Sequence, residues 1–130
     1  MIFSVCVLCA PYTSQEAFAA YQFVQAAITK GHTIHRVFFH GDGVLNANCL
    51  NTPPQDELNL YTAWVDLANT YKIELVVCIA SALRRGIIDQ DEAQRYEKPA
   101  YSLQAPFILS GLGQLIDAII ESDRFISFGN

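Results

Sequence analysis

Residues 73–80, with the sequence IELVVCIA, form a short apolar run that includes Cys78 near its end. Such a run predicts a buried β-strand, and residues 81–86 (SALRRG) predict one short helical turn after it. Cys78 is therefore expected where a strand ends, with the guanidinium groups of Arg84 and Arg85 just beyond. Helix termini and neighbouring cations favour the thiolate, which is the nucleophilic form of cysteine. Free cysteine is also among the most buried residue types, so an inert core thiol is the alternative.

Strand and helix patterns alternate along the rest of the chain. Further strands are predicted at residues 2–9, 33–39, 106–109 and 124–128. Helices are predicted after a cap at Thr13 or Ser14, from Thr52 with two prolines in the first turn, from Asp89 to Tyr96, and from Ser110 as a cap. This alternation predicts an α/β fold with a mostly parallel sheet and helices on both of its faces. The length of 130 residues predicts a single domain, residues 1–130.

The composition excludes several classes of partner. The net charge is −5, and the eight basic residues are scattered apart from the pair Arg84 and Arg85, which argues against direct binding of nucleic acid. No stretch approaches the roughly 18 apolar residues of a membrane span. The apolar N-terminus has no basic leader and is expected to be a first strand, which predicts a cytoplasmic protein with reduced thiols. Charged residues make up only 16%, which predicts apolar surface covered by other chains.

Four cysteines occur, at positions 6, 9, 49 and 78. Cys6 and Cys9 have the C-x-x-C spacing of a redox pair or half of a zinc site. Residues three apart on a strand point to opposite faces, and no second C-x-x-C completes a zinc site. Core packing is therefore the expected role of Cys6 and Cys9, and no metal is predicted.

Chemistry in parallel α/β sheets gathers beyond the carboxyl ends of the strands. Besides Cys78, three segments fall at predicted strand ends: Cys9, residues 40–43 (HGDG) and the pair Ser110 and Gly111. The HGDG segment could bind phosphate or metal, although its glycines are explained as turn residues and no phosphate-binding loop is present. The segment 110–113 (SGLG) offers free N–H groups to an anion, or serves tight helix packing.

Three segments together resemble the DsrE/TusD family of sulfur-relay proteins. They are residues 38–44 (FFHGDGV), residues 77–82 (VCIASA) with Arg85 and Gly86, and residues 110–115 (SGLGQL). The resemblance extends over essentially the whole chain in length and element order. It implies a three-layer α/β/α domain and a sulfurtransferase without a cofactor, in which Cys78 carries sulfur as a persulfide.

The same resemblance implies partners. They are DsrF-like and DsrH-like subunits in an α2β2γ2 heterohexamer, a DsrC/TusE-like protein whose cysteine accepts the sulfur, and a TusA-like or rhodanese-like donor. Overall likeness favours a role in sulfur oxidation. Sulfur relay for tRNA 2-thiouridine synthesis, a non-catalytic scaffold subunit and a flavodoxin-like or nucleotide-binding module are the alternatives.

In the expected mechanism the thiolate of Cys78 attacks the outer sulfur of a donor persulfide, and an acceptor cysteine then removes that sulfur. Arg84 and Arg85 are the nearest cations in sequence that could stabilise the thiolate, with Ser110 and Gly111 as further supporting residues.

Overall fold

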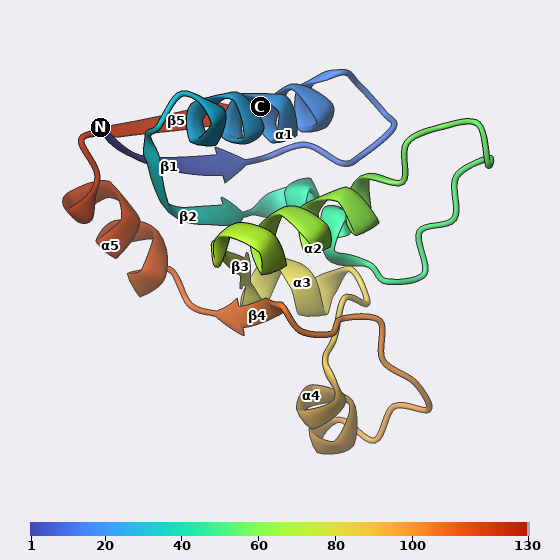
Figure 1. Cartoon of the computed structure of the whole chain (residues 1–130). Coiled ribbons are helices and arrows are strands. Elements are labelled where there is room, and N and C mark those ends of the chain that lie inside the picture. Colours follow the sequence, from blue (N-terminus) through green and yellow to red (C-terminus); the bar gives the residue numbers. More distant parts are fainter. Residues whose placement is uncertain (130) are drawn as a thin grey trace.

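The computed structural model describes residues 1–129 and contains one five-stranded sheet (Figure 1). The strands are β1 (Ile2–Val7), β2 (Thr33–Phe39), β3 (Glu74–Cys78), β4 (Phe107–Ser110) and β5 (Arg124–Phe128). Their order in the sheet is β4-β3-β2-β1-β5, and each neighbouring pair is parallel. The carboxyl ends of all five strands therefore meet at one edge of the sheet.

Helices connect these strands. They are α1 (Glu16–Thr29), the 3-10 helix η1 (Gly41–Ala47), α2 (Leu60–Tyr71), α3 (Ile79–Arg84), α4 (Gln90–Arg95) and α5 (Gly113–Glu121). α1 and α2 cover one face of the sheet while α5 covers the other (Figure 1). α1 and α2 lie close together, whereas α5 lies apart from them (Figure 1). The predicted three-layer α/β/α fold with a parallel central sheet is confirmed.

The main core lies between the sheet and the pair α1 and α2. Alternate residues of each strand point to this side because side chains on a strand alternate between faces, as Val37 and Phe39 do. Trp64 of α2 is fully buried here and makes edge-to-face contacts with the rings of Tyr21 and Phe39, each with centroids 5.4 Å apart. This layer holds most of the buried apolar side chains.

The opposite face of the sheet is covered by α5. A smaller buried cluster lies here, made of Cys6, Phe38, Val76 and Cys78, and Leu115 of α5 packs against it. The face is less completely covered, since Ala118 is the one fully buried residue of α5.

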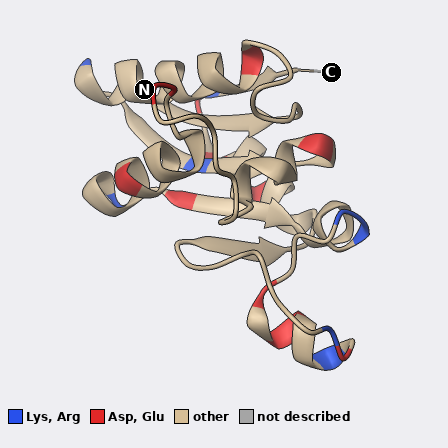
Figure 2. Ribbon diagram, turned by 90° about the vertical axis from the view of Figure 1, so that its right-hand side faces the viewer, with Lys and Arg blue, Asp and Glu red and all other residues tan. Residues whose placement is uncertain are grey.

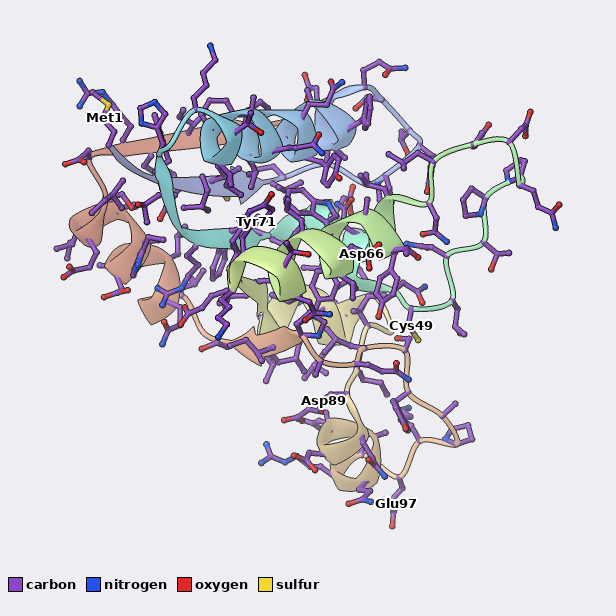
Figure 3. The ribbon with its side chains drawn as sticks, in the orientation of Figure 1. Met1, Cys49, Asp66, Tyr71, Asp89 and Glu97 are labelled. Atoms are coloured by element: carbon purple, nitrogen blue, oxygen red, sulfur yellow. The ribbon has the colours of Figure 1, made fainter. Side chains whose placement is uncertain are left out.

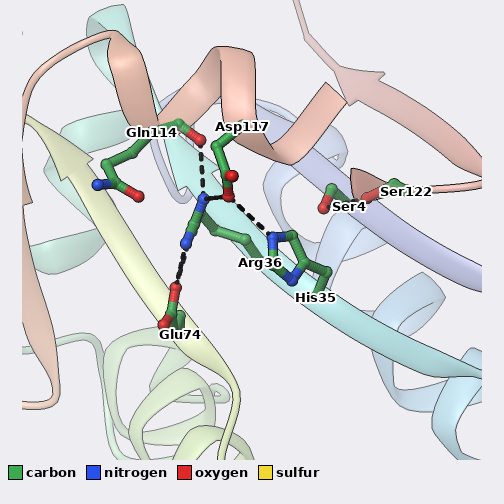
Figure 4. A network of polar contacts seen from close by, with 7 residues as sticks. All are labelled: Ser4, His35, Arg36, Glu74, Gln114, Asp117 and Ser122. Atoms are coloured by element: carbon green, nitrogen blue, oxygen red, sulfur yellow. Dashed lines mark hydrogen bonds and ion pairs between the residues drawn. The ribbon is translucent and has the colours of Figure 1, made fainter. Parts of the chain in front are cut away.

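A buried arginine fixes α5 to this second face (Figure 4). The Arg36 guanidinium donates hydrogen bonds to Asp117 at 2.6 Å, to Glu74 through Nε at 2.8 Å, and to the Gln114 carbonyl at 2.9 Å. His35 lies 3.1 Å from the same Asp117 carboxylate. Burial lowers the pKa of Arg36, and the hydrogen bonds to the two carboxylates outweigh this and raise it. Arg36 therefore stays charged and joins β2, β3 and α5.

The predicted start of the second helix is wrong. The two prolines predict a helix from Thr52, but α2 begins at Leu60. The Asn59 side chain caps the helix by accepting a hydrogen bond from the Thr62 N–H at 3.1 Å. The Tyr12 hydroxyl accepts a hydrogen bond from the Leu60 N–H at 2.9 Å, so a contact distant in sequence helps to set this boundary.

The prediction that Ser110 caps the last helix is also wrong. Ser110 is the final residue of β4, and Leu112 precedes α5 without a side-chain cap. The helix predicted from Asp89 is confirmed, and the Asp89 carboxylate caps it by accepting a hydrogen bond from the Glu92 N–H at 2.9 Å. The short turn expected at residues 81–86 begins earlier, at Ile79, directly after Cys78.

The distribution of charge agrees with the composition. The basic residues lie on separate elements rather than along one stripe (Figure 2). Among residues 1–129, no helix has both the length and the apolar character needed to cross a membrane.

Candidate active site

Cys78 lies at the carboxyl edge of the sheet, as the sequence predicts. It is the last residue of β3, and it immediately precedes α3 in an extended conformation (φ −61°, ψ 116°). Cys78 is only 3% exposed, and its thiol forms no disulfide. Cys78 therefore lies at the end of a strand, but in the isolated chain it is almost completely covered by other residues.

Two neighbouring strands place polar residues beside Cys78. Ser110 of β4 is its partner in the sheet register. On the other side Phe39 pairs with Val77, and His40 follows Phe39 as Cys78 follows Val77. His40, Cys78 and Ser110 therefore form one row across the end of the sheet. His40 and Ser110 are half-buried, so the row is accessible on both sides of the thiol.

Within the HGDG segment, His40 precedes η1 and residues 41–43 form its first turn. Gly41 has φ +57°, a conformation that favours glycine, and its N–H donates to the Ser81 hydroxyl at 3.1 Å. A Cβ atom on Gly43 would lie 1.9 Å from the Val7 carbonyl oxygen, so only glycine fits there. These contacts hold η1 between the end of β1 and the start of α3.

The two arginines occupy different environments. Arg85 donates to the Asp42 carboxylate at 2.9 Å and to the Ser81 carbonyl at 3.0 Å, so its charge bridges α3 and η1 at the edge that carries Cys78. Arg84, the last residue of α3, is exposed. Arg85 thus has a fixed place near the site, and Arg84 is free to extend into solvent.

Gly111 does not serve tight packing. A Cβ atom added to Gly111 or to Gly113 would meet nothing within 4 Å, so the close-packing interpretation of this segment is wrong. The chain leaves β4 at Ser110, and open space surrounds the connection to α5 next to the row that contains Cys78.

The other cysteines are placed differently. Cys6 is 4% exposed in the cluster with Cys78, and burial, followed by the nearby Cys78, raises the pKa of its thiol to about 11. Cys9 packs against the main core, on the other face from Cys6, as the strand periodicity predicts. Burial raises the pKa of Cys9. Cys49 lies on the long loop between η1 and α2 (Figure 3). Cys6 therefore remains a neutral thiol. Cys6, Cys9 and Cys49 lie in three different parts of the structure.

Among residues 1–129, no group of three His, Cys, Asp or Glu side chains is gathered closely enough to hold a metal ion. Two acidic residues near this end of the fold have structural partners. Asp42 pairs with Arg85, and Asp89 caps α4.

Sequence reasoning missed two features of this region. It considered His40 as part of a segment that could bind phosphate or metal and did not place it beside Cys78. The usable signal was that both residues fall at the carboxyl ends of predicted strands. Sequence reasoning also missed the Arg36 and Asp117 ion pair, for which a basic residue inside a predicted buried strand was the only sign.

Comparison with known proteins agrees with this architecture. The model of the DsrE/DsrF-like family matches residues 1–128. The chain belongs to the DsrE/DsrF-like family. Among its relatives, the protein of Allochromatium vinosum named as the sulfurtransferase DsrE is 49% identical over 120 residues, 92% of each chain. The sulfurtransferase TusD of Serratia proteamaculans is 52% identical over 117 residues, 90% of this chain and 91% of TusD.

The fold of this DsrE/DsrF-like chain also recurs in a solved structure, the YchN protein of E. coli. The two share a TM-score of 0.77 and 18% identity, over 98% of this chain and 100% of YchN. That likeness concerns the fold alone. The names of the closely similar relatives confirm the predicted class of activity, and this family member is a sulfurtransferase.

Proposed function

We propose that Cys78 carries sulfane sulfur as a persulfide and passes it to a cysteine of a partner protein. The observation that carries this proposal is the position of Cys78 at the junction of β3 and α3, on the edge where α/β folds perform chemistry. Neither Cys6 nor Cys9 offers an equal alternative, because burial raises the pKa of both thiols and disfavours the thiolate.

The cover over Cys78 suits a carrier of reactive sulfur. A persulfide has to be kept from oxidants and stray thiols, and the cluster of Cys6, Phe38 and Val76 with Leu115 provides an apolar surrounding. Donor and acceptor cysteines would approach along the row of strand ends, past the half-buried His40 and Ser110. Small displacements of side chains there would admit an extended cysteine-bearing segment.

Arg85 and Ser110 are the supporting residues with the best positions. Arg85 is held near the site by Asp42, and its positive charge favours anionic sulfur at the same edge of the sheet. Ser110 is the sheet neighbour of Cys78 and could donate a hydrogen bond to the persulfide. Gly111 keeps the space beside that strand open. Arg84, exposed on α3, would attract the acidic surface of a partner instead.

Partner subunits are supported by the outer surface of α5 and β4. Five large apolar residues are between 48% and 71% exposed there: Ile108, Leu112, Ile116, Ile119 and Ile120. An apolar surface of this kind marks a protein interface. We assign it to DsrF-like and DsrH-like subunits of an α2β2γ2 heterohexamer, in which a TusA-like or rhodanese-like protein supplies sulfur and a DsrC/TusE-like protein receives it.

For the physiological role we favour sulfur oxidation, which is supported by the 49% identity to DsrE. Relay for tRNA 2-thiouridine synthesis is the second candidate, because the identity to TusD of Serratia proteamaculans is 52%. The proteins that purify with the chain distinguish the two: DsrC-like acceptors support oxidation, and TusE-like acceptors support thiolation. The free thiols of Cys6 and Cys78 favour a cytoplasmic location for either role.

Peptide mapping tests the role of Cys78 directly. Trypsin separates the cysteines, because residues 73–84 contain Cys78 alone, residues 37–72 contain Cys49, and residues 1–30 contain Cys6 and Cys9. After incubation with a persulfide donor and blocking of free thiols, the peptide of residues 73–84 should gain the mass of one sulfur atom. Cys78→Ser should abolish loading and transfer, and Cys6→Ser, the matched control in the same cluster, should retain both.

Sulfur that still loads on Cys78→Ser and reaches the acceptor at the wild-type rate would overturn the proposal. A wild-type chain that loads no sulfur on Cys78, even when assembled with its partners, would instead favour the scaffold alternative. The 3% exposure of Cys78 is the observation that keeps this alternative open to test.

A further inference from the structure

His40 faces the same side of the sheet as Cys78. Its imidazole stacks on the ring of Phe38, with centroids 6.4 Å apart and planes 30° from parallel. Phe38 belongs to the buried cluster that contains Cys78. The imidazole therefore lies over the α5 side of the sheet, at the end where Cys78 lies.

The backbone places His40 one step from Cys78 across the sheet. Phe39 pairs with Val77, and His40 continues the strand in an extended conformation (φ −134°, ψ 153°). The His40 N–H donates to the Val7 carbonyl at 3.0 Å, which keeps the residue aligned with β1. Neighbouring strands lie about 4.8 Å apart, so the next step of the register brings His40 beside Cys78.

The imidazole of His40 has an unused polar atom. Its Nδ1 is buried and has no hydrogen-bond partner among the described residues. By contrast, His35 on the same strand engages Asp117 at 3.1 Å. An unsatisfied buried nitrogen is unfavourable for folding and needs a physical account. A neutral imidazole nitrogen without a partner is able to accept a proton from a neighbouring thiol.

We propose that His40 is the proton-transfer partner of Cys78, an inference that rests on the proposed persulfide relay. Neutral His40 takes the proton of the Cys78 thiol and becomes imidazolium. The thiolate attacks the outer sulfur of the donor persulfide, so that one S–S bond forms on Cys78 as the donor's S–S bond breaks. The electron pair of the broken bond stays on the donor sulfur, and this departing thiolate takes the proton from His40. The transfer needs no external oxidant or reductant.

The other titratable groups around His40 either stay neutral or already have ion-pair partners. Cys6 of β1 remains a neutral thiol because burial raises its pKa. Asp42 of η1 pairs with Arg85 of α3, and Asp117 of α5 pairs with Arg36 and His35 at the far end of β2. The thiol of Cys78 is therefore the group on the neighbouring strand with which His40 can exchange a proton.

The pH dependence of sulfur loading on the peptide of residues 73–84 tests this inference. In the wild type the loading rate should show a pH-dependent step that requires a neutral imidazole. His40→Gln should lack this step, so that its rate rises only as the thiol itself ionises at higher pH. At neutral pH its rate should fall about 100-fold, the lower range for general acid–base catalysis. His32→Gln, which removes an imidazole at the opposite edge of the sheet, should keep the wild-type profile.

A His40→Gln chain that folds and keeps the wild-type profile overturns the inference and leaves the persulfide relay standing. Loading that survives in Cys78→Ser instead overturns the relay itself. If His40→Gln does not fold, the ring signals of His40 are titrated by NMR in wild type and in Cys78→Ser. Coupling between the two groups predicts different midpoints, and equal midpoints would reject it.

Discussion

The two faces of the sheet differ in what they bury. The face under α1 and α2 carries a large apolar core around Trp64, with fully buried rings and aliphatic side chains from the sheet and from both helices. The apolar cluster under α5 contains four buried residues, two of them cysteines, and lies next to an arginine network that joins strand and helix. One face therefore supplies most of the hydrophobic stabilisation, whereas the other combines two buried cysteines with an exposed apolar surface on α5.

The difference follows from how α5 is attached. An ordinary amphipathic helix turns its apolar stripe to the sheet, but α5 leaves Ile116 and Ile120 57% and 71% exposed. Its attachment depends on Leu115, on Ala118 and on polar contacts to Arg36. On its inner side the helix packs Leu115 against the cluster that contains Cys78, and on its outer side it exposes the isoleucines that the proposed interface uses.

Replacing a leucine by alanine should destabilise the fold more in α2, which packs on the main core, than in α5. Leu67→Ala in α2 removes a side chain that is 7% exposed in the main core, and should lower the free energy of unfolding by about 2–5 kcal/mol. Leu115→Ala in α5 removes a half-buried side chain, and should cost about 1 kcal/mol, since little cavity forms at a partly open site. Denaturant unfolding measures both, and equal losses would contradict the asymmetry.

Acid should weaken the attachment of α5 more than it weakens the main core. Hydrogen bonds from His35 and then Arg36 lower the pKa of Asp117 below its model-compound value of 3.8. A carboxylate with a depressed folded-state pKa stabilises the fold above its unfolded pKa, and this contribution is lost as the pH falls through the folded pKa. Asp117→Asn should therefore be less stable than wild type near neutral pH and should lose less stability as the pH falls below 3.8.

Asp66 on α2 provides a control for this titration, because it is an exposed carboxylate on the other face (Figure 3). Asp66→Asn should follow the wild-type dependence of unfolding free energy on pH. A parallel dependence in wild type and Asp117→Asn would show that the ion pair does not stabilise α5.

A substitution on the outer surface of α5 should have the smallest effect on the stability of the chain. Ile120→Asp replaces the most exposed isoleucine of that helix, and should change the free energy of unfolding by no more than about 0.5 kcal/mol. Association with partner subunits should be lost, because a charge would be buried in the interface. Size-exclusion chromatography of the co-expressed subunits checks this. A complex of unchanged size would remove α5 from the interface, and an exposed Tyr71→Asp change on α2 should leave assembly intact.

Local sequence was sufficient for much of the fold. The apolar run that ends at Cys78 and the regular alternation of patterns predicted the parallel sheet and its helices, because strand and helix periodicity are local properties. The helix from Asp89 and the opposite faces of Cys6 and Cys9 were predictable for the same reason.

Boundaries that depend on distant contacts were not predictable. The prolines after Thr52 have the features of a helix start, but Tyr12 and Asn59 satisfy the backbone at Leu60 and move the start there. Ser110 has the character of a capping residue, yet the pairing of β4 with β3 extends the strand through it.

By itself the sequence determined the class of fold, the family and the cysteine at the end of a strand, since these depend on residue order and local pattern. The tertiary structure decided which groups surround that cysteine. Strand order β4-β3-β2 placed Ser110 and His40 on either side of Cys78, and the buried Arg36 brought α5 across the sheet. These neighbours come from distant parts of the chain, and only the pairing of strands and the need to satisfy a buried charge bring them together.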